Sequence, residues 1–380
     1  MLILKNLGRN KRRTILTLVA IALPLFVFLI TSTLKEQIDR TFTEMEKSMR
    51  VATHQRLTYT TMLPQRIRGE IESIAPEGYL EAVCSSAWFG GKIEGTQQSF
   101  PSMAVDHDTF HIVYNDYEMT DDEVAKFADE KRGAVIGKEF AKALNVGVGD
   151  RVTLKGTIPP FPELEFIVTA IPEGLSDPWL YFRLDYYDEV TREMTGSPIG
   201  VHNFWMRAST PQAQRWALNE IDLHFANSQH ETRTETESTF IRAFLESGGD
   251  WVGMAWRIGC MVVFVALSVG FNTMSMAYRE RISEIAVLRA MGFSSGRIAF
   301  MVVSEGLLLG LMGGLLAVVP IYLLTNLREI SLPGVGAFAI DPPVAGMVMV
   351  VAVLCGVFAA LVPAITASRL EVTTALRKVA

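Results

Sequence analysis

Four long apolar segments without any Asp, Glu, Lys or Arg constrain this 380-residue chain more than any other feature. They are Thr14–Leu34, Ile258–Tyr278, Gly306–Leu327 and Pro342–Ser368, with 21, 21, 22 and 27 residues. A helix of roughly 20 residues crosses the hydrocarbon core of a bilayer. Helices buried in soluble proteins rarely stay free of charge over that length. The sequence therefore predicts four transmembrane helices, in agreement with a mean hydropathy of +0.25.

The distribution of charge predicts how these helices are oriented. The stretch 35–250 holds 21 Lys and Arg against 35 Asp and Glu, a net charge of −14, whereas the rest of the chain carries +8. Basic residues cluster before the first span, between the second and third, and after the fourth. Under the positive-inside rule, both termini and the 279–297 loop are cytoplasmic, and 35–250 and the link 328–341 lie outside.

These observations predict an α-helical membrane protein with four transmembrane helices and a mixed α/β extracytoplasmic domain inserted between helices 1 and 2. The expected parts are, in chain order, a cytoplasmic interfacial helix 1–13, a first span 14–34, the extracytoplasmic domain with its stalks 35–250, a second span 251–278, a cytoplasmic loop 279–297, a third span 298–327, an extracytoplasmic link 328–341, a fourth span 342–367 and a cytoplasmic tail 368–380.

Local patterns within 35–250 support both helices and strands. Thr120 followed by Glu123 predicts a capping box at a helix start, and Thr210 predicts another helix N-cap. A turn over Gly147–Asp150 precedes a predicted strand, and a second predicted strand ends at Pro172. The expected domain is therefore mixed α/β.

The sequence contains no set of residues that we interpret as catalytic, cofactor-binding or metal-binding. The chain has no G-x-x-x-x-G-K-[ST] motif, so it is not expected to bind and hydrolyse ATP through a P-loop. Asp106, His107, Asp108 and His111 could supply metal ligands, but no third partner is identifiable and a solvated loop is favoured. Cys84 is expected to be a buried free thiol, with a bridge between chains as the alternative. The acidic domain argues against nucleic acid as a partner.

The short cytoplasmic loop carries the strongest functional signal. Residues 279–297 read RERISEIAVLRAMGFSSGR, in which charged and apolar residues alternate on a predicted helix that Gly292 would end. A charged helix fixed at the membrane surface by two spans can dock on a partner and transmit force. The alternative is a solvated loop helix that only satisfies the positive-inside rule. The residues alone leave both interpretations open.

The segment 271–314, FNTMSMAYRERISEIAVLRAMGFSSGRIAFMVVSEGLLLGLMGG, resembles the permease subunits of the MacB/FtsX class of ABC transporters. Three further segments are similar to this family: LKNLGRNKRRTILTLVAIAL at the start, IGKEFAKALNVGVGDRVTL in the domain, and VPAITASRLEVTTALRKV at the end. Val372 stands where many members have proline. The resemblance is weak over 50–115 and 175–250.

The resemblance implies a role without catalytic, cofactor or metal residues in this chain. Members pair as dimers, identical or not, and each chain docks on a separate cytoplasmic ATPase subunit that binds ATP and Mg. ATP-driven motion then passes to the extracytoplasmic domains. The location implied is the bacterial inner membrane, with lipid around the spans and a periplasmic adaptor as a further candidate partner. The expected coupling residues are Arg279, Glu280, Arg281, Glu284, Ile285, Leu288, Arg289 and Gly292.

A glycine stripe on the third predicted span suggests close helix packing. Gly306, Gly310 and Gly314 form two consecutive G-x-x-x-G spacings, which let another helix approach closely. We expect a helix-packing face there, and a dimer interface is the further hypothesis.

The expected function is export or extraction of a substrate by such a permease. An FtsX-like regulator that activates a cell-wall hydrolase is the alternative within the family. A membrane receptor signalling through a partner ATPase is the rival from another class. The sequence does not identify the substrate.

Overall fold

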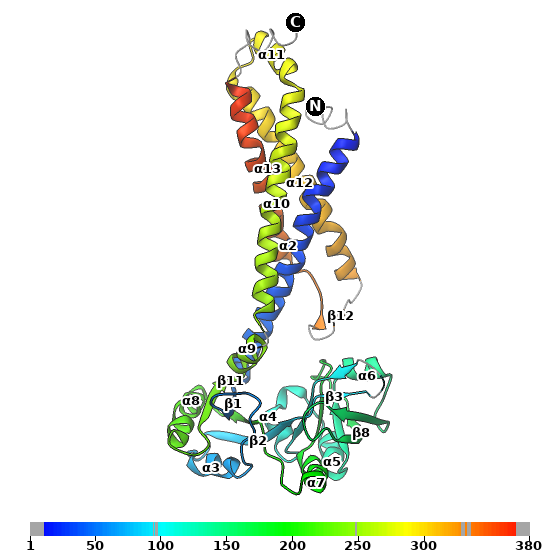
Figure 1. Cartoon of the computed structure of the whole chain (residues 1–380), viewed down its shortest axis with the longest axis vertical. Coiled ribbons are helices and arrows are strands. Elements are labelled where there is room, and N and C mark those ends of the chain that lie inside the picture. Colours follow the sequence, from blue (N-terminus) through cyan, green and yellow to red (C-terminus); the bar gives the residue numbers. More distant parts are fainter. Residues whose placement is uncertain are drawn as a thin grey trace. The chain divides into compact units, whose positions relative to one another are not determined.

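The computed structural model describes residues 11–93, 95, 98–247, 249–327, 331–332 and 336–369 (Figure 1). Most of the predicted interfacial helix 1–13 and most of the tail 368–380 lie outside the described residues. The chain divides into two compact units. The membrane unit contains the chain up to Asp39, the segment from Asp250 to Ser331, and the chain from Ala337 onward. The sheet unit is centred on Arg40–Gly249.

The membrane unit contains four helices long and apolar enough to cross a bilayer, which confirms the predicted number among the described residues. They are α2 (Lys11–Met45), α10 (Trp251–Glu280), α12 (Ser295–Leu327) and α13 (Pro342–Ser368). A short helix, α11 (Ile282–Ala290), lies between α10 and α12. The long helix α2 continues past the predicted span because the polar residues that follow, LKEQIDRTFTEM, are mostly good helix formers.

The membrane helices bury one side and expose the other. Leu25, Leu29 and Val348 are fully buried between helices. In contrast, Phe264 on α10 and Phe300 on α12 are 69% and 74% exposed. So many large apolar side chains on the outside of a helix bundle are typical of a surface that faces lipid.

The sheet unit is built on eleven strands in the order β11-β1-β10-β2-β5-β9-β6-β8-β7-β3-β4 among the described residues. The strands are β1 (Arg50–Gln55), β2 (Leu80–Trp88), β3 (Gly91–Lys92), β4 (Ser99–Phe100), β5 (Ser102–Val105), β6 (Gly133–Ile136), β7 (Arg151–Gly156), β8 (Glu163–Ala170), β9 (Leu180–Arg183), β10 (Asn203–Ala208) and β11 (Thr232–Thr236). Neighbouring strands are mostly antiparallel, but β5–β9 and β6–β8 are parallel. The mixed α/β class is confirmed.

Helices cover this sheet in two groups (Figure 1). The first group, α3 (Ile67–Ile74) and α8 (Pro211–Phe225), lies with β1, β2 and β11. The second group, α5 (Asp121–Asp129), α6 (Lys138–Leu144) and α7 (Leu184–Thr195), lies with β3 and β8. The remaining helices are α4 (Phe110–Val113), α9 (Glu237–Ser247) and the 3₁₀ turns Glu46–Ser48 and Asn115–Tyr117.

Several predicted local features of the sheet unit are confirmed. Thr120 and Glu123 form the capping box at the start of α5. The side chain of Thr210 accepts a hydrogen bond from the backbone N–H of Ala213 at the start of α8. The predicted strand that ends at Pro172 is β8, which ends two residues earlier because proline has no N–H for the ladder.

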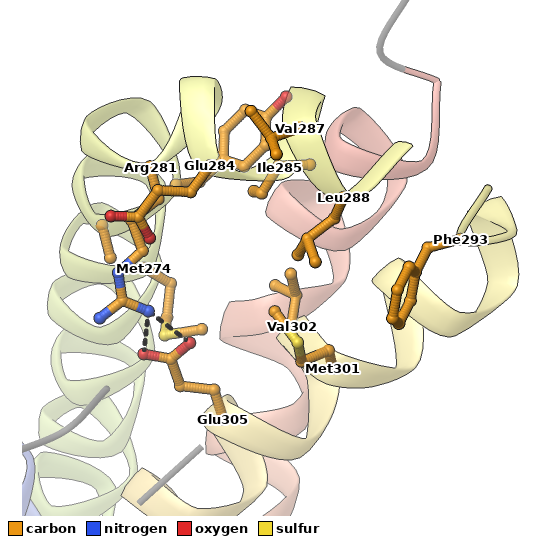
Figure 2. A pocket seen from close by; sticks show the side chains of 12 residues that line it. Met274, Arg281, Glu284, Ile285, Val287, Leu288, Phe293, Met301, Val302 and Glu305 are labelled. Atoms are coloured by element: carbon orange, nitrogen blue, oxygen red, sulfur yellow. Dashed lines mark hydrogen bonds and ion pairs between the residues drawn. The ribbon is translucent and has the colours of Figure 1, made fainter. Parts of the chain in front are cut away.

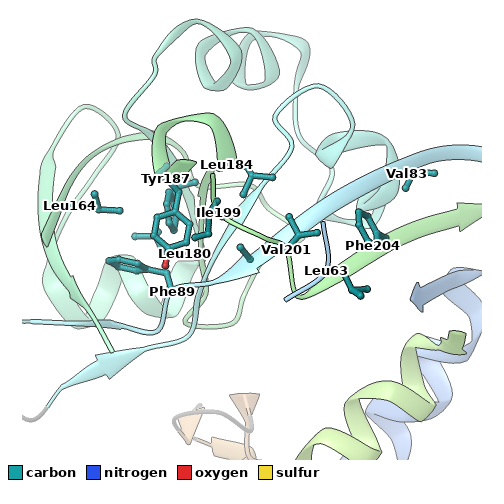
Figure 3. Packing of buried hydrophobic residues seen from close by; sticks show 14 of the residues in the cluster. Leu63, Val83, Phe89, Leu164, Leu180, Leu184, Tyr187, Ile199, Val201 and Phe204 are labelled. Carbon is teal, nitrogen blue, oxygen red and sulfur yellow. The ribbon is translucent and has the colours of Figure 1, made fainter. Parts of the chain in front are cut away.

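Aromatic and aliphatic residues fill the core between the sheet and its helices (Figure 3). Phe89, Phe182 and Tyr187 meet edge to face, with ring centroids 5.3 to 5.7 Å apart. Such pairs add about 1 kcal/mol each beyond the burial of their area. Phe182 is on β9, Tyr187 is on α7 and Phe89 is in the loop after β2, so these contacts join the three elements in one core.

A buried ion pair joins β1 to α9, the elements next to the two ends of the sheet unit. The Nε of Arg50 donates to Glu237 at 2.9 Å, and both side chains are buried. The hydroxyl of Ser48 also donates to Glu237, at 2.8 Å. Burial opposes the charged form of Arg50, but the charges of Glu237 and Asp116 outweigh it and raise the pKa of Arg50.

Candidate functional site

The short helix α11 is delimited by a break at each end. α10 ends at Glu280, and Arg281 has φ −106° and ψ 14°, outside regular helical geometry. Past α11, Gly292 adopts φ +91°, a conformation in which a side chain would be strained. The prediction that Gly292 ends the helix is confirmed.

The predicted start of this helix is wrong by three residues. Arg279 and Glu280 complete the last turn of α10, and α11 begins at Ile282. The helix breaks at Arg281, whose guanidinium donates to the carboxylate of Glu305 on α12. The turn in the chain at Arg281 accompanies this contact.

The ion pair between Arg281 and Glu305 links the start of α11 to α12 (Figure 2). One terminal nitrogen of the guanidinium lies 3.1 Å from each of the two carboxylate oxygens of Glu305. The side chains are 22% and 12% exposed, so water screens this pair only partly. Charge-assisted hydrogen bonds of this kind are among the strongest in proteins.

A second polar contact links the end of α11 to α12. The guanidinium of Arg289 donates to the side-chain oxygen of Ser295, the first residue of α12. This contact closes the connection that contains Gly292. Both ends of α11 are thus tied to α12 by arginine side chains.

A cavity of about 370 Å³ lies between α10, α11 and α12 (Figure 2). Its walls are mainly apolar, and its charged members are Arg281, Glu284 and Glu305. The lining residues are Met274, Ala277, Tyr278, Arg281, Glu284, Ile285, Val287, Leu288, Phe293, Met301, Val302 and Glu305. The cavity means that α11 rests on α12 through a few contacts instead of a continuous packed face.

The two faces of α11 differ in burial. Ile285 and Ala286 are buried against the membrane unit. Val287 and Met291, by contrast, are 49% and 64% exposed, next to exposed charged residues. A surface with apolar side chains among charges is suited to contact with another protein.

The structure brings together part of the predicted coupling set. Arg281, Glu284, Ile285 and Leu288 all line the cavity. Glu305 is the charged residue of the cavity that was not in the predicted coupling set, although it stands directly before the charge-free segment Gly306–Leu327. The remaining predicted residues, Arg279, Glu280, Arg289 and Gly292, lie beside the cavity and do not line it.

The glycine stripe of α12 packs against α13 of the same chain. A Cβ atom on Gly306 would lie 2.4 Å from the carbonyl oxygen of Gly356, and one on Gly310 would lie 2.4 Å from that of Ala352. A Cβ on Gly314 would lie 2.7 Å from the Cβ of Ala352. Close packing is as predicted, and the helix that packs on the stripe is α13 of the same chain. The hypothesis of a dimer interface on these glycines stays a prediction.

In the sheet unit, Arg68 contacts both aspartates of the predicted cluster Asp106, His107, Asp108 and His111. Arg68 donates to Asp106 at 2.8 Å and lies 3.4 Å from an oxygen of Asp108. Burial raises the pKa of Asp106, against the opposing effects of Ser85 and Arg68. In the part of the chain that the structure describes, no three potential ligands converge on a metal position. Cys84 is buried and free, and burial raises the pKa of its thiol.

The models of two protein families match this chain. The model of the MacB-like periplasmic core domain matches residues 14–222, more than half of the chain. The chain belongs to the MacB/FtsX-type ABC transporter permeases. The FtsX-like permease C-terminal model matches residues 257–372, which include α11 and its cavity. The predicted resemblance is confirmed.

Two relatives of this permease are themselves permease components. ABC transporter permease YtrF of Bacillus subtilis strain 168 is 29% identical over 163 residues, which are 39% of this chain and 35% of YtrF. Lipoprotein-releasing system transmembrane protein LolC of Haemophilus influenzae is 24% identical over 258 residues, which are 64% of this chain and 63% of LolC. The matches therefore span less than two thirds of either relative.

Two of the solved structures similar to the permease are an extracellular domain and a periplasmic region. The extracellular domain of the transporter YknZ from Gram-positive bacteria shares 11% identity, with a TM-score of 0.34, over 49% of this chain and 99% of that domain. The periplasmic region of MacB from Actinobacillus actinomycetemcomitans shares 15% identity, with a TM-score of 0.32, over 52% of this chain and 92% of that region.

Proposed function

We propose that this chain is the membrane subunit of an ABC transporter whose ATPase is a separate cytoplasmic polypeptide, and that α11 is the element on which the ATPase docks. The ATPase binds ATP and Mg, and this permease converts its movement into movement of the sheet unit. Export or extraction of a substrate is the proposed outcome.

The single observation that carries this proposal is the construction of α11. It is a helix of nine residues, joined to a long apolar helix at each side and tied to α12 at both ends. Val287 on α11 and Met291 directly after its last residue are exposed near charged residues. A partner that binds these residues can move α11, and the attached helices then carry the movement into the bilayer.

The charge distribution supports the same orientation. The basic residues around α11 favour the cytoplasmic side, where an ATPase has access to ATP. One predicted span, 251–278, separates α11 from the stretch 35–250, so the same orientation assigns that stretch to the opposite side. The absence of a P-loop motif in the sequence agrees with an ATPase supplied by another chain.

Co-purification of the permease with its ATPase tests the proposal. Val287→Asp places a charge on the exposed side of α11, and Met291→Asp places one directly after its end. We expect both to reduce the amount of ATPase retained about tenfold, because desolvating a carboxylate opposes docking. Leu223→Asp, at an exposed position of α8 in the sheet unit, is the matched control.

The control variant is expected to retain the ATPase at the wild-type level. All variants should insert in the membrane in equal amounts, because the substituted positions are exposed. Full retention of the ATPase by both α11 variants would show that the partner binds elsewhere.

A further inference from the structure

The space between α11 and α12 raises the question of how a push on α11 reaches α12. Leu288 of α11 and the α12 residues Met301 and Val302 line the cavity of about 370 Å³ between the two helices (Figure 2). Protein interiors transmit displacement well because they are close-packed. Across a cavity, displacement of one wall can be absorbed by the empty volume.

The Arg281–Glu305 ion pair crosses from one wall of this cavity to the other. Both residues line the cavity, and the pair joins the break between α10 and α11 to the body of α12. The contact of one guanidinium nitrogen with both carboxylate oxygens, at 3.1 Å each, fixes the separation of the two groups.

The surroundings of the pair make its separation unfavourable. Glu305 is only 12% exposed and lies among apolar neighbours, including Met274 and Met301. Removing a carboxylate from its cation in such a place leaves an uncompensated charge with little water around it. The two side chains therefore stay together when α11 is displaced.

We propose that Arg281 and Glu305 are positioning residues, which hold the start of α11 at a set distance from α12 so that movement of α11 is passed to α12 instead of compressing the cavity. This inference rests on the proposed docking of an ATPase on α11. Glu305 is on α12 and lines the cavity, so this role of the pair is distinct from binding of the ATPase to the exposed side of α11.

The experiment separates docking from transmission in the full complex of permease and ATPase in lipid nanodiscs. Spin labels are attached at Phe300 on α12 and Val265 on α10, both exposed, and their distance is measured with and without ATP. Wild type is expected to show an ATP-dependent change in this distance. Glu305→Gln and Arg281→Gln are expected to lose the change while they retain the ATPase.

Rescue tests whether the ion pair itself matters. Arg281→Glu alone should lose the distance change, and the double variant Arg281→Glu with Glu305→Arg should restore it. Arg257→Gln, which removes an exposed ion pair with Asp250 at the other end of α10, is the control and should behave as wild type. Thermal stability in detergent is measured for every variant, and a purely structural pair would lower stability without changing the ATP-dependent distance.

The outcomes distinguish this inference from the proposed function. An unchanged ATP-dependent distance in Glu305→Gln, or failure of the charge-swapped variant to restore it while the ATPase stays bound, would overturn the positioning role. Loss of ATPase retention in Glu305→Gln would also overturn it, because the pair would then serve docking. A wild-type chain that retains no ATPase would contradict the proposed function instead.

Discussion

At the scale of single residues, Gly310 shows how little space separates α12 from α13. A Cβ atom at this position would meet the carbonyl oxygen of Ala352 at 2.4 Å, a backbone atom that cannot rotate away. We expect Gly310→Leu to destabilise the membrane unit by about 1–3 kcal/mol through overpacking. Thermal unfolding in detergent measures this loss.

Gly346 on α13 provides the matched control for that substitution. It lies in a helix of the same unit, but a Cβ atom added there meets no atom within 4 Å. Gly346→Leu should therefore unfold at the wild-type temperature or slightly above it. Equal loss of stability in both variants would argue against the close contact between α12 and α13.

His202 makes the stability of the sheet unit dependent on pH. It is buried, and its Nδ1 accepts a hydrogen bond from the backbone N–H of Trp88 at 3.1 Å. Burial lowers the pKa of His202 to about 4, whereas an unfolded histidine titrates near 6.5. Because the unfolded state binds the proton more readily, the contribution of His202 is complete above pH 6.5 and is lost as pH falls toward 4. At pH 5 the loss is about 2 kcal/mol.

Tryptophan fluorescence during unfolding at pH 7 and pH 5 measures this dependence. His202→Asn keeps an acceptor at the position of Nδ1 for the N–H of Trp88 and cannot titrate, so its stability should change less between the two pH values. Burial also lowers the pKa of His54, so some dependence in the same direction remains. Identical pH dependence in wild type and His202→Asn would contradict the assigned role.

At the scale of elements, substitutions in α11 should impair coupling to the ATPase without preventing insertion of the chain in the membrane. Glu284→Lys and Arg289→Glu reverse charges on α11, and the second also removes the contact with Ser295. We expect each variant to lower stimulation of the ATPase by the permease about tenfold while it inserts normally. ATP hydrolysis by the reconstituted complex is the measurement. Unchanged co-purification and ATPase stimulation in both variants would remove α11 as the coupling element.

The four apolar helices and the mixed domain were predictable because their signals are local. Charge-free runs indicate spans, and side chains such as Thr120 mark where helices begin. The order of the eleven strands was not predictable, since β1 pairs with β10 and β11, far away in the sequence. Long-range pairing of this kind depends on packing between distant segments, which leaves no periodic signal in one chain.

The residues of the candidate site on α11 were predictable from the sequence, but their partners on α12 were not. The predicted residues Arg281 and Leu288 do line the cavity, because the pattern of the loop places them on one short helix. Their partners on α12, including Glu305 and Met301, become neighbours only when the chain turns back at Gly292. The three-residue error at the start of α11 has the same origin, since the contact of Arg281 with α12 accompanies the break.

At the scale of the whole molecule, the sheet unit has to move as one body if it is to respond to the membrane helices. The buried pair of Arg50 and Glu237 joins β1 to α9 and so ties together the two ends of the unit. Glu237→Ala removes the buried carboxylate partner of the Arg50 guanidinium and leaves only the half-exposed Asp116 beside it, and we expect a loss of about 3 kcal/mol in the free energy of unfolding.

Urea unfolding of the full chain in detergent, followed by tryptophan fluorescence, measures the effect of Glu237→Ala. Glu231→Ala is the control, because Glu231 forms an exposed pair with Arg56 and should contribute less than about 1 kcal/mol. A similar small effect in both variants would show that the buried pair does not hold β1 to α9.

The central claim is that α11 and the sheet unit lie on opposite sides of the membrane, with α11 on the side where an ATPase can bind. Cysteines introduced at the exposed positions Val287 on α11 and Leu57 in the sheet unit test this claim with a membrane-impermeant maleimide. The parent protein is the background control, because Cys84 is buried and Cys260 and Cys355 lie in membrane helices.

In intact cells stripped of any outer membrane, the reagent should label Leu57→Cys and leave Val287→Cys unlabelled, and in inside-out vesicles the result should reverse. Labelling of both positions from the same side of the membrane would contradict the proposed docking of an ATPase on α11.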